Sequence, residues 1–132
     1  MGASDYLEEK ILDHVFNLNS LVQPASMYVA LFTAAPSDSG GGTEVSGNAY
    51  ARVEVTNNSS SWTRTNSTVV NDNAITFPTP TPSGWGTVTH YGIYDASSGG
   101  NLIDWNVLTN ARVTQAGTPL EFAAGALVFT VS

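Results

Sequence analysis

The residue types best suited to chemistry gather in one segment of the sequence, 84–102, which reads GWGTVTHYGIYDASSGGNL. It contains His90 and Asp95, and Asp104 follows two residues after its end. A histidine that meets a serine and a carboxylate can run acyl transfer, and two carboxylates that face a cleft can hydrolyse a glycosidic bond. The segment is therefore a catalytic pocket, a sugar-binding platform or one hairpin of an ordinary β-fold.

The local pattern favours the hairpin. Ser97-Ser98-Gly99-Gly100 reads as a turn between two β-rich runs, and an aspartate beside a turn more often shapes that turn than reacts. The sequence has no G-x-S-x-G nucleophile elbow. His14, the other histidine, stands on a predicted helix among acidic neighbours. We predict that the protein is not an enzyme, and a hydrolase using Asp95 and Asp104 is the alternative.

Neither a metal nor an organic cofactor is predicted. The sequence has no cysteine, no H-x-x-x-H spacing and no Asp-rich calcium loop. Five aromatic residues are candidates for sugar stacking, namely Trp62, Trp85, Tyr91, Tyr94 and Trp105. Trp85 stands between two glycines after a proline-rich segment and is the best candidate among them for an exposed contact residue. Trp105 alternates in phase with Ile103 and Val107 and is predicted to be core.

The charge balance argues against two classes of partner. The chain of 132 residues has 4 basic and 11 acidic residues, giving a net charge of −7. Four scattered cations cannot neutralise a phosphate backbone, and the negative field repels both nucleic acid and anionic membranes. No apolar run approaches the ~20 residues that span a bilayer, and MGASDYLEEK lacks the features of a signal peptide.

The first 19 residues predict one amphipathic helix, 1–19. Leu7, Ile11 and Val15 fall on one stripe, and Phe16 widens it. Such a stripe packs on the protein's own sheet or on a neighbouring subunit. We single out these four side chains as candidate contacts with a neighbouring subunit or another partner protein.

The remainder, 26–132, predicts a β-domain that forms a single domain with the helix. Residues 27–33, MYVALFT, are apolar on both faces, so something must cover each face of this strand; we expect the helix on one side. A glycine-rich loop, 34–49, and about six further strands follow. The fold class is mainly β: an antiparallel β-sandwich or partly closed barrel with one N-terminal amphipathic helix.

The strand that carries His90 alternates imperfectly. Val88 and Tyr94 share the phase of His90, so Gly92 is expected to mark a β-bulge or a close backbone approach. Whether Trp85 and His90 point into the core or toward a neighbouring subunit is left open by the pattern, and both are candidate contact residues.

Four strings, in this order and spacing, carry a family resemblance. They are YLEEKILDHVF, MYVALFTAAPSDSGGGTEVSGNAYARVEV, AITFPTPTPSGWGTVTHYGIYDASSGGNLIDWNVL and FAAGALVFTV. The chain resembles a family of small tailed-bacteriophage virion structural proteins, often labelled phage tail fibre proteins. Asn48 departs from the family, where Gly-Gly is commoner.

The resemblance implies a non-enzymatic structural protein located in the virion. A single domain without repeats suits a head decoration or cement protein that stabilises the capsid. The alternative is a tail fibre or tail-tip module that binds host surface carbohydrate. The expected partners are the major capsid protein or other virion proteins and further copies of the chain, with a trimer as the first expectation.

Overall fold

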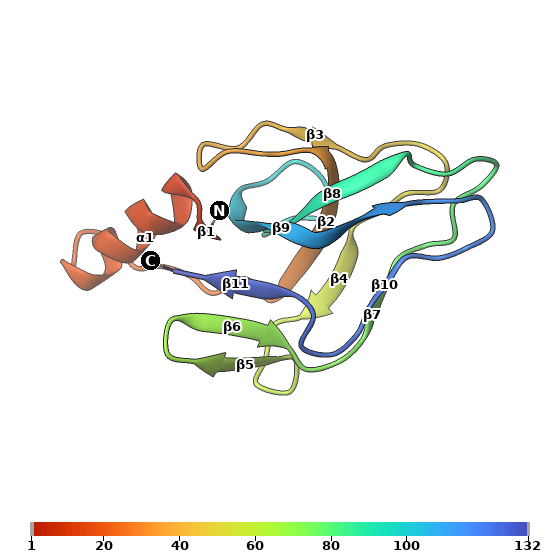
Figure 1. Ribbon diagram of the computed structural model, residues 1–132. Coiled ribbons are helices and arrows are strands. Elements are labelled where there is room, and N and C mark those ends of the chain that lie inside the picture. The colour runs from red at the N-terminus through yellow and green to blue at the C-terminus, as the bar shows by residue number, and fades with distance from the viewer. Residues whose placement is uncertain (1, 132) are drawn as a thin grey trace.

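The computed structural model describes residues 2–131, which form two packed layers of antiparallel β-structure with one helix at an open end (Figure 1). The elements are β1 (Gly2–Ala3), α1 (Asp5–Val15), β2 (Ser26–Ala34), β3 (Thr43–Glu44), β4 (Val53–Thr56), β5 (Trp62–Thr65), β6 (Thr68–Asn71), β7 (Ile75–Thr76), β8 (Thr87–Tyr94), β9 (Leu102–Val113), β10 (Glu121–Phe122) and β11 (Val128–Thr130). The predicted sandwich with a helix is confirmed, and the sheets do not close into a barrel.

The larger layer is a sheet in the order β1-β9-β8-β2, and β3 and β4 share the far edge of β2. β4 pairs with the first half of β2, from Ser26 to Val29, and β3 pairs with the second half, from Phe32 to Ala34. The three long strands at its centre are rich in β-branched and aromatic residues, which suit a pleated and buried surface.

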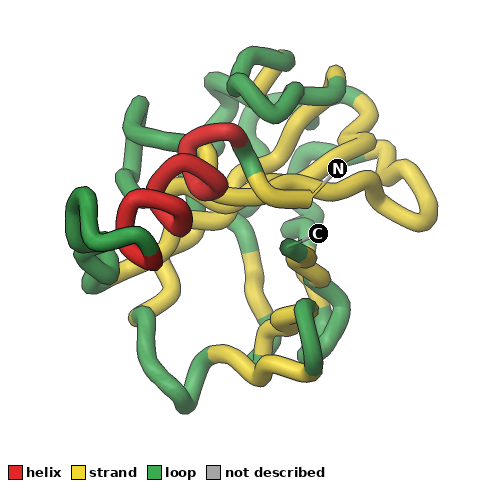
Figure 2. Tube along the Cα trace, turned by 90° about the vertical axis from the view of Figure 1, so that its left-hand side faces the viewer, coloured by secondary structure: helices red, strands yellow, loops and turns green. Residues whose placement is uncertain are grey.

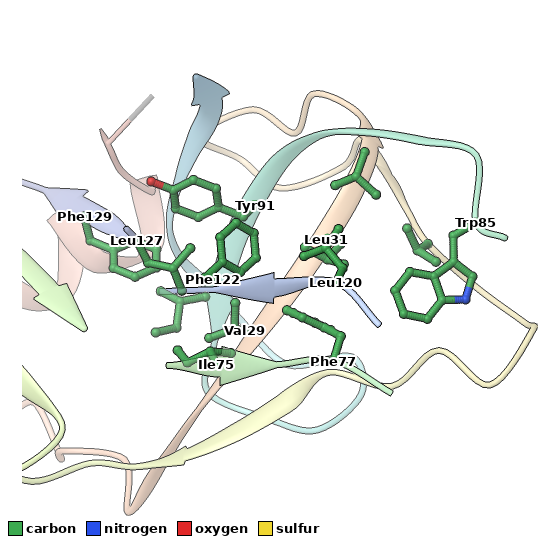
Figure 3. Close-up of a cluster of buried hydrophobic side chains, with 13 residues drawn as sticks. Val29, Leu31, Ile75, Phe77, Trp85, Tyr91, Leu120, Phe122, Leu127 and Phe129 are labelled. Atoms are coloured by element: carbon green, nitrogen blue, oxygen red, sulfur yellow. The ribbon is translucent and has the colours of Figure 1, made fainter. Parts of the chain in front are cut away.

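The smaller layer consists of a sheet in the order β11-β6-β5 and the pair β10-β7. Apolar side chains from both layers form the main core, which Figure 3 shows with Trp85 at one end and Phe129 at the other. Its fully covered members include Val29, Leu31, Val88, Phe122 and Leu127. Burial of these side chains, at about 25 cal/mol per Å² of apolar area, holds the layers together.

The outer face of the large sheet carries a second, smaller cluster. Ala30, Phe32, Tyr94 and Leu102 are buried there. The sequence predicted that the helix would cover one face of β2, but α1 buries none of its own side chains. Part of the cover comes from the glycine-rich loop, where the Asp38 carboxylate accepts a hydrogen bond of 3.0 Å from the Trp105 indole.

The helix is shorter than predicted, spanning Asp5–Val15 instead of 1–19. It begins after Ser4, whose side chain accepts a hydrogen bond of 3.2 Å from the Leu7 backbone N–H. Gly2 and Ala3 pair with β9 as strand β1. Phe16 is the C-cap, and Asn17 has a φ of 60°, a left-handed conformation that stops the helix.

Two irregularities shift the phase of the central hairpin. In β8 the register changes between Val88 and His90, where the single residue Thr89 lies opposite residues 108–111 of β9, and Val88 joins Tyr91 in the main core. Of the two alternatives expected at Gly92, the close approach is found, and the register irregularity lies between Val88 and His90 instead. A Cβ placed there would lie 3.1 Å from Cε2 of Phe32.

In β9 the register changes opposite Ile93 and Tyr94, so Ile103 is the extra residue. Beyond it, Asp104 pairs with Ile93 and faces the space between the layers, and Trp105 packs on the outer cluster. The expectation that Ile103, Trp105 and Val107 share a core face was wrong, because the bulge reverses the alternation after Ile103.

Candidate docking site

Three strongly exposed apolar side chains lie at the tip of α1 and just beyond it. Val15 is 67 % exposed, Phe16 68 % and Leu18 70 %. Leaving a large apolar side chain in water forgoes about 1.5–3 kcal/mol of burial free energy. Scattered apolar residues are common on surfaces, but a contiguous patch marks an interaction site.

The base of the same helix is firmly fixed to the sandwich. The Ser4 hydroxyl donates to the Leu102 carbonyl oxygen, and the Ser4 backbone N–H donates to Ile103 over 2.9 Å. The Asp5 N–H donates to the Asp38 carbonyl over 2.8 Å. Because these bonds hold only the first turn, the far end of the helix projects from the end of the molecule, as Figures 1 and 2 show.

An apolar cavity of about 180 Å³ lies between the layers, next to the base of α1. Every layer contributes to its walls. The apolar lining side chains include Leu7, Met27, Val69, Ile93, Ile103 and Phe129. A cavity of this size is larger than the roughly 150 Å³ apolar cavity that holds a benzene molecule.

Two polar groups beside the cavity have no hydrogen-bond partner among residues 2–131. They are the Trp62 indole Nε1 and the Asp104 carboxylate Oδ1. Asp104 is only 3 % exposed, and burial raises the pKa of its carboxyl to about 7. A buried polar group without a partner costs about 1–3 kcal/mol, so such groups call for an explanation.

The predicted contact residues of α1 fall into two groups. Leu7 lines the cavity, and Ile11 is partly covered. Val15 and Phe16 are exposed, together with Leu18 beyond the helix. The sequence stripe therefore divides along its length into an anchored half and an uncovered half.

The expected exposure of Trp85 was wrong. Its side chain is 8 % exposed, and its indole N–H donates to the Asn48 carbonyl over 2.9 Å. The ring packs edge-on against Tyr50 and Phe77 at one end of the core. The glycines on either side of Trp85 accommodate a turn, and the indole itself points inward.

His90 lies on the outer face of the large sheet and is partly covered. Its ring centroid is 5.9 Å from that of Trp105, and Nδ1 lies 2.8 Å from the Thr89 hydroxyl. Burial lowers the pKa of His90, which favours the neutral ring. His90 therefore packs against side chains of its own sheet. Its contact with another subunit stays a prediction.

The hydrolase alternative gains no support from the hairpin. The Asp95 carboxylate sits at the exposed turn and accepts bonds of 2.7 and 3.0 Å from the backbone and side chain of Asn101. Asp104 instead faces the apolar cavity. The two carboxylates thus have separate environments and no shared cleft, and Asp95 has the turn-forming role that the sequence pattern favoured.

The aromatic residues do not form a common sugar-stacking surface within residues 2–131. Trp62, Trp85 and Tyr91 belong to the main core or its margin, and Tyr94 and Trp105 belong to the outer cluster. Among these described residues no cluster of acidic, histidine or cysteine side chains could hold a metal ion. In the same part of the chain, no helix has the length and apolar character needed to cross a membrane.

The sequence reasoning missed the cavity and its two polar groups. The available signal was Asp104 itself, a lone carboxylate within an apolar strand. Its inward direction depends on the bulge at Ile103, which no local pattern announced.

The chain matches a known protein family. The family described as "Podophage GP4 fiber I protein gp80" matches residues 2–130. No curated protein matches the chain.

Proposed function

The chain belongs to the podophage GP4 fiber I protein gp80 family, and from this premise we propose that it is a non-enzymatic fibre subunit that attaches through the apolar tip of α1. We define this apolar tip as Val15, Phe16 and Leu18. The family is one of phage virion structural proteins. Our proposal adds two claims to this family membership: that the protein attaches through the apolar tip, and that it catalyses no reaction.

The exposure of the apolar tip carries the proposal. Three large apolar side chains, each about two-thirds exposed, lie within four residues of one another in the sequence, at the end of an anchored helix. Covering them on assembly recovers their burial free energy, which favours a bound state over a free one. A fibre subunit must be attached to the rest of the particle, and an uncovered apolar helix end is suited to such an attachment.

The environments of the candidate catalytic residues support a non-enzymatic function. Asp95 is engaged in a turn, Asp104 faces an apolar cavity and His90 packs against Trp105. Sugar binding through Trp85 gains no support, since that indole is buried.

Head decoration is the second candidate location. It is supported by the shape of the described residues, two packed β-layers without a repeated or extended shaft. The printed family name favours a fibre. In either location the partners would be the major capsid protein or other virion proteins, contacted by the same tip.

Incorporation into particles tests the proposal. Phage carrying Phe16→Asp should assemble virions that lack this protein by immunoblot, because an aspartate at the tip cannot be buried without a large desolvation penalty. Val113→Asp is the matched control, since Val113 is 72 % exposed at the far end of β9. Normal incorporation of a folded Phe16→Asp protein would overturn the proposal, and antibody labelling of wild-type virions distinguishes fibre from head.

A further inference from the structure

The molecule carries both an uncovered apolar projection and an unfilled apolar hollow. The projection is the apolar tip, with Phe16 at its centre and 68 % exposed. The hollow is the cavity of about 180 Å³ beside Leu7. A chain cannot place its own Phe16 in this cavity, because the intervening turns of α1 hold the tip away from its base.

We propose that the cavity receives the Phe16 side chain of a second copy, so that identical chains assemble by inserting α1 tips into neighbouring cavities. This inference rests on the proposed function and names the partner of the apolar tip. Each copy gives one tip and receives one. Such a contact joins two different surfaces of the same molecule, and repetition closes it into a symmetric oligomer when the rotation permits.

The sizes agree. An apolar cavity of roughly 150 Å³ is sufficient for benzene, so a cavity of about 180 Å³ accommodates a phenyl ring. The entering ring would contact side chains from both layers, among them Ile103 and Phe129. Filling the hollow adds the dispersion contacts that its lining lacks in the free chain.

The exposed apolar area supplies part of the surface that self-association requires. Besides the tip, Leu12 is 56 % and Val22 82 % exposed. Together with the tip they present on the order of 500 Å² of apolar surface, against about 800 Å² per partner in a specific interface. The tip and the cavity margin on each copy would together approach a standard interface.

Polar residues lie beside both the apolar tip and the cavity, where they would form the polar rim of the interface. Asn17 and Asn19 flank Leu18 at the tip and are exposed. Asn57 and Ser67 stand at the cavity. Interfaces with an apolar centre and a polar rim bind specifically, because the rim side chains exclude water from the centre while staying hydrogen-bonded.

The first test is the self-association of purified protein, measured by analytical ultracentrifugation. Wild type should form a concentration-dependent oligomer. Phe16→Ala should weaken its formation at least about tenfold, and Val113→Ala, at an equally exposed site, should not. A wild type that stays monomeric at the highest concentration, or a Phe16→Ala protein that associates like wild type, overturns the proposal.

The second test separates tip from cavity. Ser67 lies in the exposed turn after β5 and lines the cavity, so Ser67→Trp should block entry without altering the core. Phe16→Asp and Ser67→Trp should each be monomeric alone. Mixed in equal amounts they should form a 1:1 heterodimer, because one copy keeps an intact tip and the other an intact cavity. Absence of the heterodimer, with both variants folded by circular dichroism, overturns the proposal.

These experiments distinguish a failure of the second-copy assignment from a failure of the proposed function. If Phe16→Asp is lost from virions while wild-type protein is monomeric in solution, attachment through the tip holds and the second-copy assignment fails. If wild type oligomerises through the tip and Phe16→Asp still enters virions, the assignment holds and the proposed attachment fails.

Discussion

The Tyr91 hydroxyl is bonded to both backbone groups of Val128, donating to its carbonyl oxygen over 3.1 Å and accepting from its N–H over 3.0 Å. Tyr91 belongs to the centre of the large sheet and Val128 to β11 of the smaller layer. One side chain therefore replaces two ladder bonds at the place where the layers meet.

Removing that hydroxyl should destabilise the fold. Tyr91→Phe keeps the ring contacts with Phe122 and Phe129 but leaves the Val128 N–H without its partner. We expect a loss of about 1–3 kcal/mol in the free energy of unfolding, measured by urea denaturation. Tyr28→Phe is the control, because the Tyr28 hydroxyl makes an exposed bond of 3.3 Å to Glu54. Equal losses for the two variants would contradict this account.

Arg52 should not tolerate lysine. Its guanidinium makes two parallel bonds of 2.8 and 2.9 Å to Glu44, donates to the carbonyls of Ala96 and Gly99, and lies 3.7 Å from the ring centroid of Tyr94. Lysine keeps the charge but loses the planar fork and the stacking.

For Arg52→Lys we expect a loss of about 1–3 kcal/mol in unfolding free energy. The readout is the shift of the thermal unfolding midpoint. Arg64→Lys is the matched control, because Arg64 is exposed and donates only to the Asn66 carbonyl. A midpoint for Arg52→Lys as high as that of Arg64→Lys would show that the bidentate geometry contributes nothing.

Composition and periodicity were sufficient for the fold class. The apolar run around Leu31 is buried on both faces, as the sequence predicted, and the glycines at 99–100 form the predicted turn. These features depend on neighbouring residues alone, so local pattern reveals them.

The errors arise where distant segments decide the outcome. Trp85 is buried because the Asn48 carbonyl, far away in the sequence, accepts its indole N–H. The phase of β9 changes at Ile103 because of a bulge set by pairing with β8. The helix begins late because Ser4 bonds to Leu102 and because Gly2 and Ala3 join the sheet. None of these contacts is visible in the hydrophobic periodicity of the sequence.

Gly92 should be irreplaceable by alanine. A Cβ there would lie 3.0 Å from Leu102 Cδ1, 3.1 Å from Phe32 Cε2 and 3.3 Å from the Asp104 carbonyl oxygen. Gly92→Ala should cost about 1–3 kcal/mol through overpacking.

Coupling with Phe32→Leu tests the cause of that cost. If the clash with the Phe32 ring matters, the double variant loses less stability than the sum of the two single variants. Strict additivity in urea denaturation would locate the cost elsewhere in the backbone.

The buried Asp104 should give the fold a specific dependence on pH. Its pKa is raised to about 7 by burial, from an ordinary value of 3.8. Between these values the folded chain keeps a proton that the unfolded chain has released, so stability from this group is full below about pH 4 and is lost as the pH rises through 7.

Replacing this carboxyl by an amide should therefore remove the loss of unfolding free energy that Asp104 causes as the pH rises toward 7. The full pKa difference corresponds to at most about 4 kcal/mol at 1.36 kcal/mol per unit, and roughly half of that is expected because water can reach the cavity wall. Asp104→Asn should approach or exceed wild-type stability at pH 8 and lose that advantage at pH 4, as measured by urea denaturation at each pH. If the difference between variant and wild type is the same at both pH values, Asp104 does not titrate in the folded state as its burial requires. Since the amide preserves the size of the side chain, such a result could not be attributed to a change in packing.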